Sequence, residues 1–100
     1  MEVTVTFRHS DPSPVLRDTI ERKISKLAKY FLKATQAHVI LNVEKSRHIA
    51  EITLAENHHT LYARADSHDM YRSLDDAVLK MQRQLKKLKE KIKAHHLHRH

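Results

Sequence analysis

The strongest constraint on the fold is a long apolar stripe in the last third of the chain. From about Asp69 onward, apolar residues recur at spacings of three and four and fall within roughly 100° of one another on a helix. The stripe consists of Met70, Leu74, Ala77, Val78, Met81, Leu85, Leu88 and Ile92. Because a stripe of this width has to be buried, the rest of the chain must supply a surface that covers it.

A second helical pattern covers about residues 15–33. It follows the segment SDPSP, in which two prolines and several cap-forming residues indicate a loop that leads into a helix. Its apolar positions are Leu16, Ile20, Ile24, Leu27 and Phe31. This helix also needs a partner for one face only.

Alternation of apolar and polar residues predicts a strand at about residues 2–8, and apolar residues that share one face predict strands at about residues 37–45, 48–56 and 60–65. The last three are joined by short connections, which favour antiparallel hairpins. The apolar face of each strand would form one side of the sheet, and the other side would be exposed through His38, Ile40, Asn42, Glu51, Thr53, Tyr62 and Arg64. Glycine is absent, so the tight turns would use Asn, Asp, Ser or His.

The predicted order is β-α-β-β-β-α, in the α+β class. The simplest architecture is a two-layer sandwich, in which a four-stranded sheet carries both helices on one face. Residues 1–94 are expected to form one domain, and residues 95–100 a flexible His-rich tail.

Composition narrows the class of protein. The absence of cysteine excludes disulfides, thiolate metal sites and a thiol nucleophile. No apolar run approaches the roughly 18 residues of a membrane span, and the first residues alternate instead of forming a signal-peptide block. A cytoplasmic protein is expected.

The positive charge is concentrated at one end of the chain. The net charge is +7, and residues 77–100 account for all of it, with eight Lys or Arg and one acid, Glu90. Arg22, Lys26, Lys29 and Lys33 form a further stripe on the first helix, opposite its apolar positions. Like charges stacked in this way cost stability, so a merely solvated face is disfavoured. The pattern predicts a continuous basic surface for a polyanion.

Among polyanions, nucleic acid is favoured over a membrane surface. A membrane-binding helix needs an exposed apolar face, whereas both apolar faces here are needed by the sheet. Lys and Arg bind phosphates without reading sequence. Aromatic residues are few, and Tyr30, Tyr62 and Tyr71 do not form the pattern of a base-stacking RNA-binding sheet. We therefore expect the protein to recognise backbone shape.

Residues 69–91, DMYRSLDDAVLKMQRQLKKLKEK, closely resemble the signature of the ribosome hibernation promoting factor family, also called the ribosome-associated inhibitor or protein Y family. The signature positions are Asp69, Met70, Tyr71, Arg83, Gln84 and Leu85. The segments VLRDTIERKISKLAKYF and HVILNVEK are similar to the same family, so the resemblance extends over residues 1 to about 94.

The resemblance implies a fold similar to double-stranded-RNA-binding domains and a translation inhibitor that binds the small ribosomal subunit. Its site would be the mRNA and tRNA channel of 16S rRNA, at the A and P sites, and its role would be to promote hibernation and protect idle ribosomes in stationary phase or stress. By matching position, the rRNA-binding residues would be Arg22, Lys23, Lys26, Lys29, Lys80, Arg83, Lys86, Lys87 and Lys89. Asp69, Met70 and Tyr71 equally suit a helix start and core anchor.

The length and the basic end resemble the short form of the family. Long members carry a second domain that pairs ribosomes, and protein Y carries an acidic extension, neither of which this sequence shows. In some bacteria short members help 100S ribosome dimers form from 70S ribosomes together with a small modulation factor. Whether dimers form here stays open.

Other readings have less support. A general structured-RNA-binding module without ribosome specificity is the main alternative. His95, His96, His98 and His100 are close enough to chelate a metal ion, but no carboxylate accompanies them, so no metal or other cofactor is expected. The sequence has no Gly-rich phosphate loop, no serine elbow and no converging Asp/Glu/His set, so neither an enzyme nor a small-molecule substrate is expected.

Overall fold

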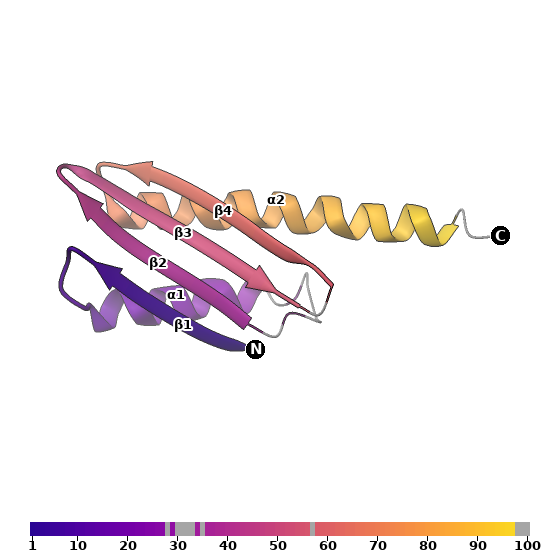
Figure 1. Ribbon diagram of the computed structural model, residues 1–100, viewed down its shortest axis with the longest axis horizontal. Helices are drawn as coiled ribbons and strands as arrows, with labels where there is room; N and C mark the ends of the chain where they lie inside the picture. The colour runs from indigo at the N-terminus through magenta and orange to yellow at the C-terminus, as the bar shows by residue number, and fades with distance from the viewer. Residues whose placement is uncertain (28, 30–33, 35, 57, 98–100) are drawn as a thin grey trace.

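The computed structural model describes residues 1–27, 29, 34, 36–56 and 58–97, with side chains as far as Lys93 (Figure 1). The elements are β1 (Glu2–Arg8), α1 (Pro14–Leu27), β2 (Gln36–Glu44), β3 (Arg47–Ala55), β4 (Thr60–Ser67) and α2 (Met70–Leu97). The strands form one sheet in the order β1-β2-β3-β4, and both helices lie on the same face of it (Figure 1). The predicted element order and two-layer architecture are confirmed.

The connections decide the strand directions. β1 and β2 run parallel because α1 carries the chain back between them, whereas the short links after β2 and β3 make those pairs antiparallel, as predicted. The strand β4 ends two residues later than the predicted residue 65. The predicted end of the first helix, which includes Phe31 and Lys33, lies outside the described residues.

The core lies between the helices and the sheet. α2 packs on β3 and β4, and α1 packs beside α2 and against β1. The fully buried large side chains are Ile20, Ile24, Leu27, Val39, Leu41, Ile52, Leu54, Ser73, Leu74, Met81 and Leu85. Complete burial of one Leu or Ile side chain contributes about 1.5–3 kcal/mol, so these contacts fix which side of each helix faces outward.

Both helices begin with a side-chain cap. Ser13 Oγ accepts a hydrogen bond of 3.2 Å from the backbone N–H of Leu16, and Pro14 occupies the first helical position. Asp69 Oδ1 accepts one of 3.2 Å from the N–H of Tyr71. Asp69 is therefore the cap of α2, which the sequence had assigned to Ser67 or Asp69.

Two non-glycine residues adopt the left-handed conformation, His9 with φ 56° and Lys45 with φ 55°. His9 follows the end of β1, and its residue type is one of those predicted for turns. Lys45, in the two-residue link between β2 and β3, is not, so the predicted choice of turn residues is wrong there. The absence of glycine leaves this lysine to adopt a conformation that costs about 1–2 kcal/mol.

The outer face of the sheet is less open than predicted. Asn42 is only 9% exposed, although the strand pattern placed it in solvent. His9 Nδ1 lies 2.9 Å from Asn42 Oδ1, and Asn42 Nδ2 donates 3.0 Å to Glu44. Ile49, paired with Asn42 in the register, is 5% exposed on the same face. The amide tolerates burial because its oxygen and nitrogen both have partners.

α2 is longer than the sheet that covers it (Figure 1). Leu85 is 1% exposed and Leu88 is half-buried, but Ile92 is 53% exposed. The predicted apolar stripe therefore extends beyond the end of the core. Burial of Ile92 by the sheet was therefore a wrong prediction. The helix continues to Leu97, past the predicted domain bound at residue 94, and the division into domain and tail stays a prediction.

Two substitutions in the same stripe test this difference. We expect Leu74→Ala to lower the free energy of unfolding by about 2–5 kcal/mol, because it empties space in the core. Ile92→Ala should change it by less than about 0.5 kcal/mol, since the side chain is already half in water. Urea unfolding followed by circular dichroism measures both, and equal losses would contradict the overhang of α2.

Candidate nucleic-acid interface

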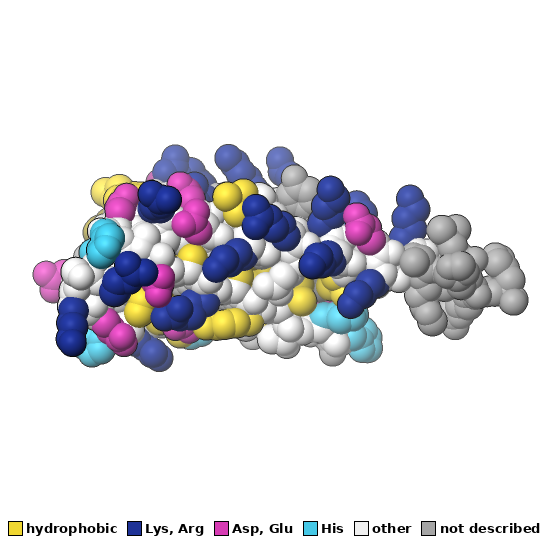
Figure 2. Space-filling view, turned by 90° about the horizontal axis from the view of Figure 1, so that it is seen from above, with side chains coloured by type: hydrophobic (Ala, Val, Ile, Leu, Met, Phe, Trp, Pro, Cys, Tyr) yellow, Lys and Arg dark blue, Asp and Glu magenta, His cyan; other side chains and the backbone are white. Residues whose placement is uncertain are grey.

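The predicted cations lie on the two helices that share one face of the sheet. On α1, Arg22 and Lys26 are exposed, Lys23 is half-buried, and Lys29 is exposed just after the helix ends. On α2, Lys80, Arg83, Lys86, Lys87 and Lys89 are all exposed. Figure 2 shows Lys and Arg side chains along the half of the molecule that carries the end of α2, where acidic side chains are few. The structure therefore brings the predicted residues together on adjacent elements.

The cations of α2 fall into two rows. At 100° per residue, Lys86, Lys89 and Lys93 follow the side toward α1, and Lys80 and Lys87 lie on the flank beside β4. Arg83 lies between the two rows and lines a depression on each side. Lys23 and Lys26 line a depression between the helices, together with Asp75 and Gln82 of α2. This depression joins the cations of α1 to the first row on α2.

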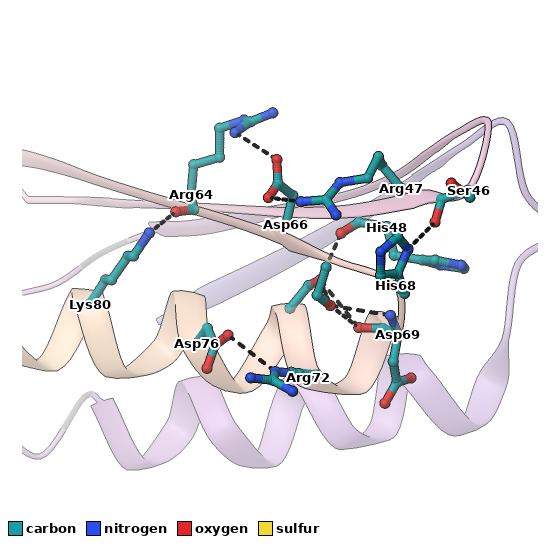
Figure 3. A network of polar contacts seen from close by, with 12 residues as sticks. Ser46, Arg47, His48, Arg64, Asp66, His68, Asp69, Arg72, Asp76 and Lys80 are labelled. Carbon is teal, nitrogen blue, oxygen red and sulfur yellow. Dashed lines mark hydrogen bonds and ion pairs between the residues drawn. The ribbon is translucent and has the colours of Figure 1, made fainter.

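Some of these cations are engaged within the protein. Lys23 Nζ lies 2.5 Å from Asp75 Oδ1, an ion pair that ties α1 to α2. Lys80 Nζ donates a hydrogen bond of 2.8 Å to the backbone carbonyl of Arg64 in β4 (Figure 3). Arg22 lies 3.7 Å from Asp18, but both side chains are about 70% exposed, so this pair contributes little. Lys23 and Lys80 are therefore partly committed to holding α1 and β4 against α2.

The remaining predicted cations are free to bind a ligand. Within the described part of the chain, no ion pair or hydrogen bond is recorded for the side chains of Lys26, Lys29, Arg83, Lys86, Lys87 and Lys89. Stacked lysines repel one another by a few tenths of a kcal/mol per neighbouring pair, and a bound polyanion would relieve that repulsion. The geometry suits phosphate groups spread along α2 and across to α1.

The signature residues divide between structure and surface. Asp69 caps α2, Met70 is 7% exposed in the core, and Leu85 is fully buried. Gln84 Nε2 donates to the backbone carbonyl of Tyr62 at 2.5 Å, which fixes α2 to β4. Asp69, Tyr71 and Arg83 are the exposed members of the signature, and of these only Asp69 has a structural role in the helix cap. The alternative reading of Asp69 and Met70, as helix start and core anchor, fits this geometry.

Sequence reasoning did not identify two features of this surface. One is the ion pair of Lys23 with Asp75, since nothing in the sequence shows that these positions meet. The other is Leu79, which is 48% exposed among the cations of α2. The signal for Leu79 was present, because it lies opposite the apolar stripe at helical spacing.

A mixed-charge cluster lies on β3 and β4, where Arg47, Arg64 and Asp66 meet. Asp66 Oδ1 accepts a hydrogen bond of 2.6 Å from Arg47, and Asp66 Oδ2 one of 3.4 Å from Arg64 (Figure 3). The hydrogen bond from Arg47, helped by the charges of both guanidinium groups, lowers the pKa of Asp66 below its ordinary value against a smaller opposing effect of burial. Arg47 and Arg64 are thus neutralised in part by the protein itself.

The described residues offer neither a metal site nor a membrane-spanning helix. The side chains of His95, His96, His98 and His100 lie outside the described residues, so the predicted absence of a metal site there stays a prediction. Elsewhere, no three His, Cys, Asp or Glu residues of the described chain are grouped as metal ligands would be. None of the helices, over their described residues, has the length and apolarity that crossing a membrane requires.

Comparison with known proteins gives a consistent result. Residues 3–93 match the family described as Sigma 54 modulation protein / S30EA ribosomal protein. The chain is 36% identical over 95 residues to a ribosome hibernation promoting factor of Klebsiella oxytoca, covering 95% of this chain and all of that protein. It is 38% identical over 91 residues to one of Azotobacter vinelandii, covering 91% of this chain and 85% of that one.

Two solved structures are similar over most of their length. A ribosomal subunit interface protein from Coxiella burnetii superposes with a TM-score of 0.84 at 29% identity, covering 90% of this chain and 99% of that one. The N-terminal domain of Thermus thermophilus protein Y gives a TM-score of 0.80 at 23% identity, covering 88% and 99%, and supports the fold alone.

The cluster around Asp66 generates a pH-dependent prediction. Because the folded pKa of Asp66 is lowered, its stabilising effect is present above the ordinary pKa of 3.8 and is lost as the pH falls through the lower folded pKa. Asp66→Asn should therefore lower the melting temperature at pH 7, and the difference from wild type should shrink below about pH 4. Thermal unfolding across this pH range measures it. A difference that persisted at the lowest pH would mean that the carboxylate charge is not the cause.

Proposed function

The chain belongs to the Sigma 54 modulation protein / S30EA ribosomal protein family, and on this premise we propose that it is a ribosome-associated translation inhibitor that promotes hibernation. It binds the small ribosomal subunit through 16S rRNA, in the mRNA and tRNA channel at the A and P sites. The relatives named ribosome hibernation promoting factor support this role, since they align over nearly the whole chain. In this proposal the protein acts in the cytoplasm, because that is where it meets ribosomes.

The observation that carries the proposal is the set of free cations on one side of the two helices. Lys26 lines the depression between α1 and α2, and Arg83 and Lys86 line the adjoining depression along α2. None of the three has a carboxylate partner within the described chain. Their charge is available to phosphates, and release of counterions from the RNA would drive association. Arg22, Lys29, Lys87 and Lys89 extend the same surface.

Lys23 and Lys80 take a different part in the proposed site. Each already has an internal partner. Each would therefore add to the positive electrostatic potential of the surface more than it would contact a phosphate directly. The role requires binding and occlusion of the channel, for which no catalytic group is needed. Free 70S and 100S ribosomes are further partners in this proposal, and the joint action with a modulation factor is carried over from the short family members.

Two double charge reversals test the proposed surface. Arg83→Glu/Lys86→Glu removes free cations of α2, and Arg8→Glu/Lys45→Glu reverses two exposed cations at the far end of the sheet with the same change in net charge. We expect the first pair to weaken binding to small subunits at least about tenfold, because two phosphate contacts become repulsive. The second pair should have a much smaller effect.

Binding of both variants is measured by co-sedimentation with purified small subunits on sucrose gradients. Inhibition of cell-free translation is a second assay. Circular dichroism checks that each is folded. Equal losses in the two variants would show that net charge alone, and not the helix surface, controls binding.

A general structured-RNA-binding module is separated from the proposed function by a comparison of ligands. At about 0.15 M salt, binding that depends on counterion release alone is strongly weakened. We expect small subunits to be retained under these conditions and a simple RNA hairpin to dissociate. A hairpin bound as tightly as the subunit would favour the general module.

A further inference from the structure

The outward side of α2 holds one leucine among its polar and charged residues. Leu79 is 48% exposed and lies opposite the buried stripe of the helix. A single exposed leucine is ordinary on a protein surface. The surroundings of this one are not, because Lys80 and Arg83 flank it on α2 and Lys26 stands across from it on α1.

Three depressions of the surface meet at Leu79. The first lies between the helices and is lined by Lys23, Lys26, Asp75, Val78, Leu79 and Gln82. The second continues along α2 from Leu79 and Gln82 to Lys93, and the third lies toward β4 between Asp66 and Arg83. Because the first two share Leu79 and Gln82, they form one groove, which we name the interhelical groove.

The interhelical groove has an apolar floor and cationic sides. Leu79, 48% exposed, supplies most of its accessible carbon surface, while Val78 and Leu85 lie buried at its base. Its cations without a recorded internal partner in the described chain are Lys26, Arg83, Lys86, Lys89 and Lys93. It contains two carboxylates, and that of Asp75 is held by Lys23, so Glu90 is the acid that remains. The lining suits a ligand that has both negative charge and an apolar face.

Resting on the proposed function, we propose that the interhelical groove binds a single, unpaired strand of the RNA and not a regular duplex. Phosphates lie along Lys26, Arg83, Lys86 and Lys89, while the base or ribose of one nucleotide packs on Leu79. Gln82, half-buried in the floor beside Leu79, has an amide that can donate to and accept from a base edge.

The physical reason lies in what each form of RNA exposes. In a duplex the base faces are stacked, so an outward leucine meets phosphate and sugar edges and buries little apolar surface. An unpaired nucleotide presents the face of its base, and Leu79 could then leave water on binding. Since no aromatic side chain lines the groove in the described chain, the contact tolerates any base, and phosphates supply most of the affinity.

Leu79→Ala tests the apolar floor, with Val15→Ala as the matched control. Val15 is 65% exposed near the start of α1 and does not line the groove. Both changes remove an exposed aliphatic side chain from a helix, and alanine favours the helix in each case. Leu79→Met, which keeps apolar volume, serves as the conservative variant.

The probes are a fluorescent oligouridine of about 12 nucleotides and a mixed-sequence RNA duplex of about 12 base pairs, titrated by anisotropy at several salt concentrations. Wild type should bind the single strand more tightly than the duplex. Leu79→Ala should weaken single-strand binding about threefold to tenfold with an unchanged salt slope, because no cation is removed. Leu79→Met should restore it, and Val15→Ala should match wild type.

Two results would contradict the proposal that the groove binds a single strand. One is tighter binding of the duplex by wild type, and the other is equal single-strand affinity of Leu79→Ala and Val15→Ala. Both leave the proposed function standing, because that is tested by co-sedimentation of the wild-type protein with small subunits. Conversely, wild type that failed to sediment with subunits would refute the ribosomal role, whatever its preference among the oligonucleotides.

Discussion

The structure depends on burying two apolar helix stripes against one face of a small sheet. With 100 residues, the chain can build one core, and both helices must use it. Ile24 of α1 and Leu74 of α2 are fully buried there together with Val39 and Ile52 of the sheet. Once these faces are fixed inward, the lysine-rich faces have to point outward and side by side. The basic surface is thus a consequence of core packing.

The protein separates its cations by giving some of them internal partners. Asp66 pairs with Arg47 and Arg64 on the sheet, and Asp76 lies near Arg72 in α2 (Figure 3). Asp75 pairs with Lys23 between the helices. Toward the end of α2, Glu90 is the one carboxylate among several lysines. The lysines there repel one another, and few acidic side chains offset this repulsion. The helix tolerates this because Met81 and Leu85 anchor its middle in the core. Stability and charge are therefore carried by different parts of the same helix.

Much of the fold could be predicted because the relevant signals are local. Alternation at residues 2–8 and helical spacing around Leu74 act within a few residues, and short links force antiparallel pairing. The failures have identifiable reasons. Burial of Asn42 depends on His9 reaching it from the end of another strand, and exposure of Ile92 depends on where the sheet stops. Lys45 turns the chain because no glycine is present to do so.

By itself the sequence determined the order of elements, which side of each is apolar, and that the excess positive charge belongs to the last helix, since these follow from spacing and composition. Tertiary structure decided which cations stay free, because the partners of Lys23 and Lys80 come from other elements that meet only on folding. It also decided that Lys26 of α1 and Leu79 of α2 share one groove. A helical pattern gives the direction of a side chain about its own axis, and only packing gives its neighbours across the gap.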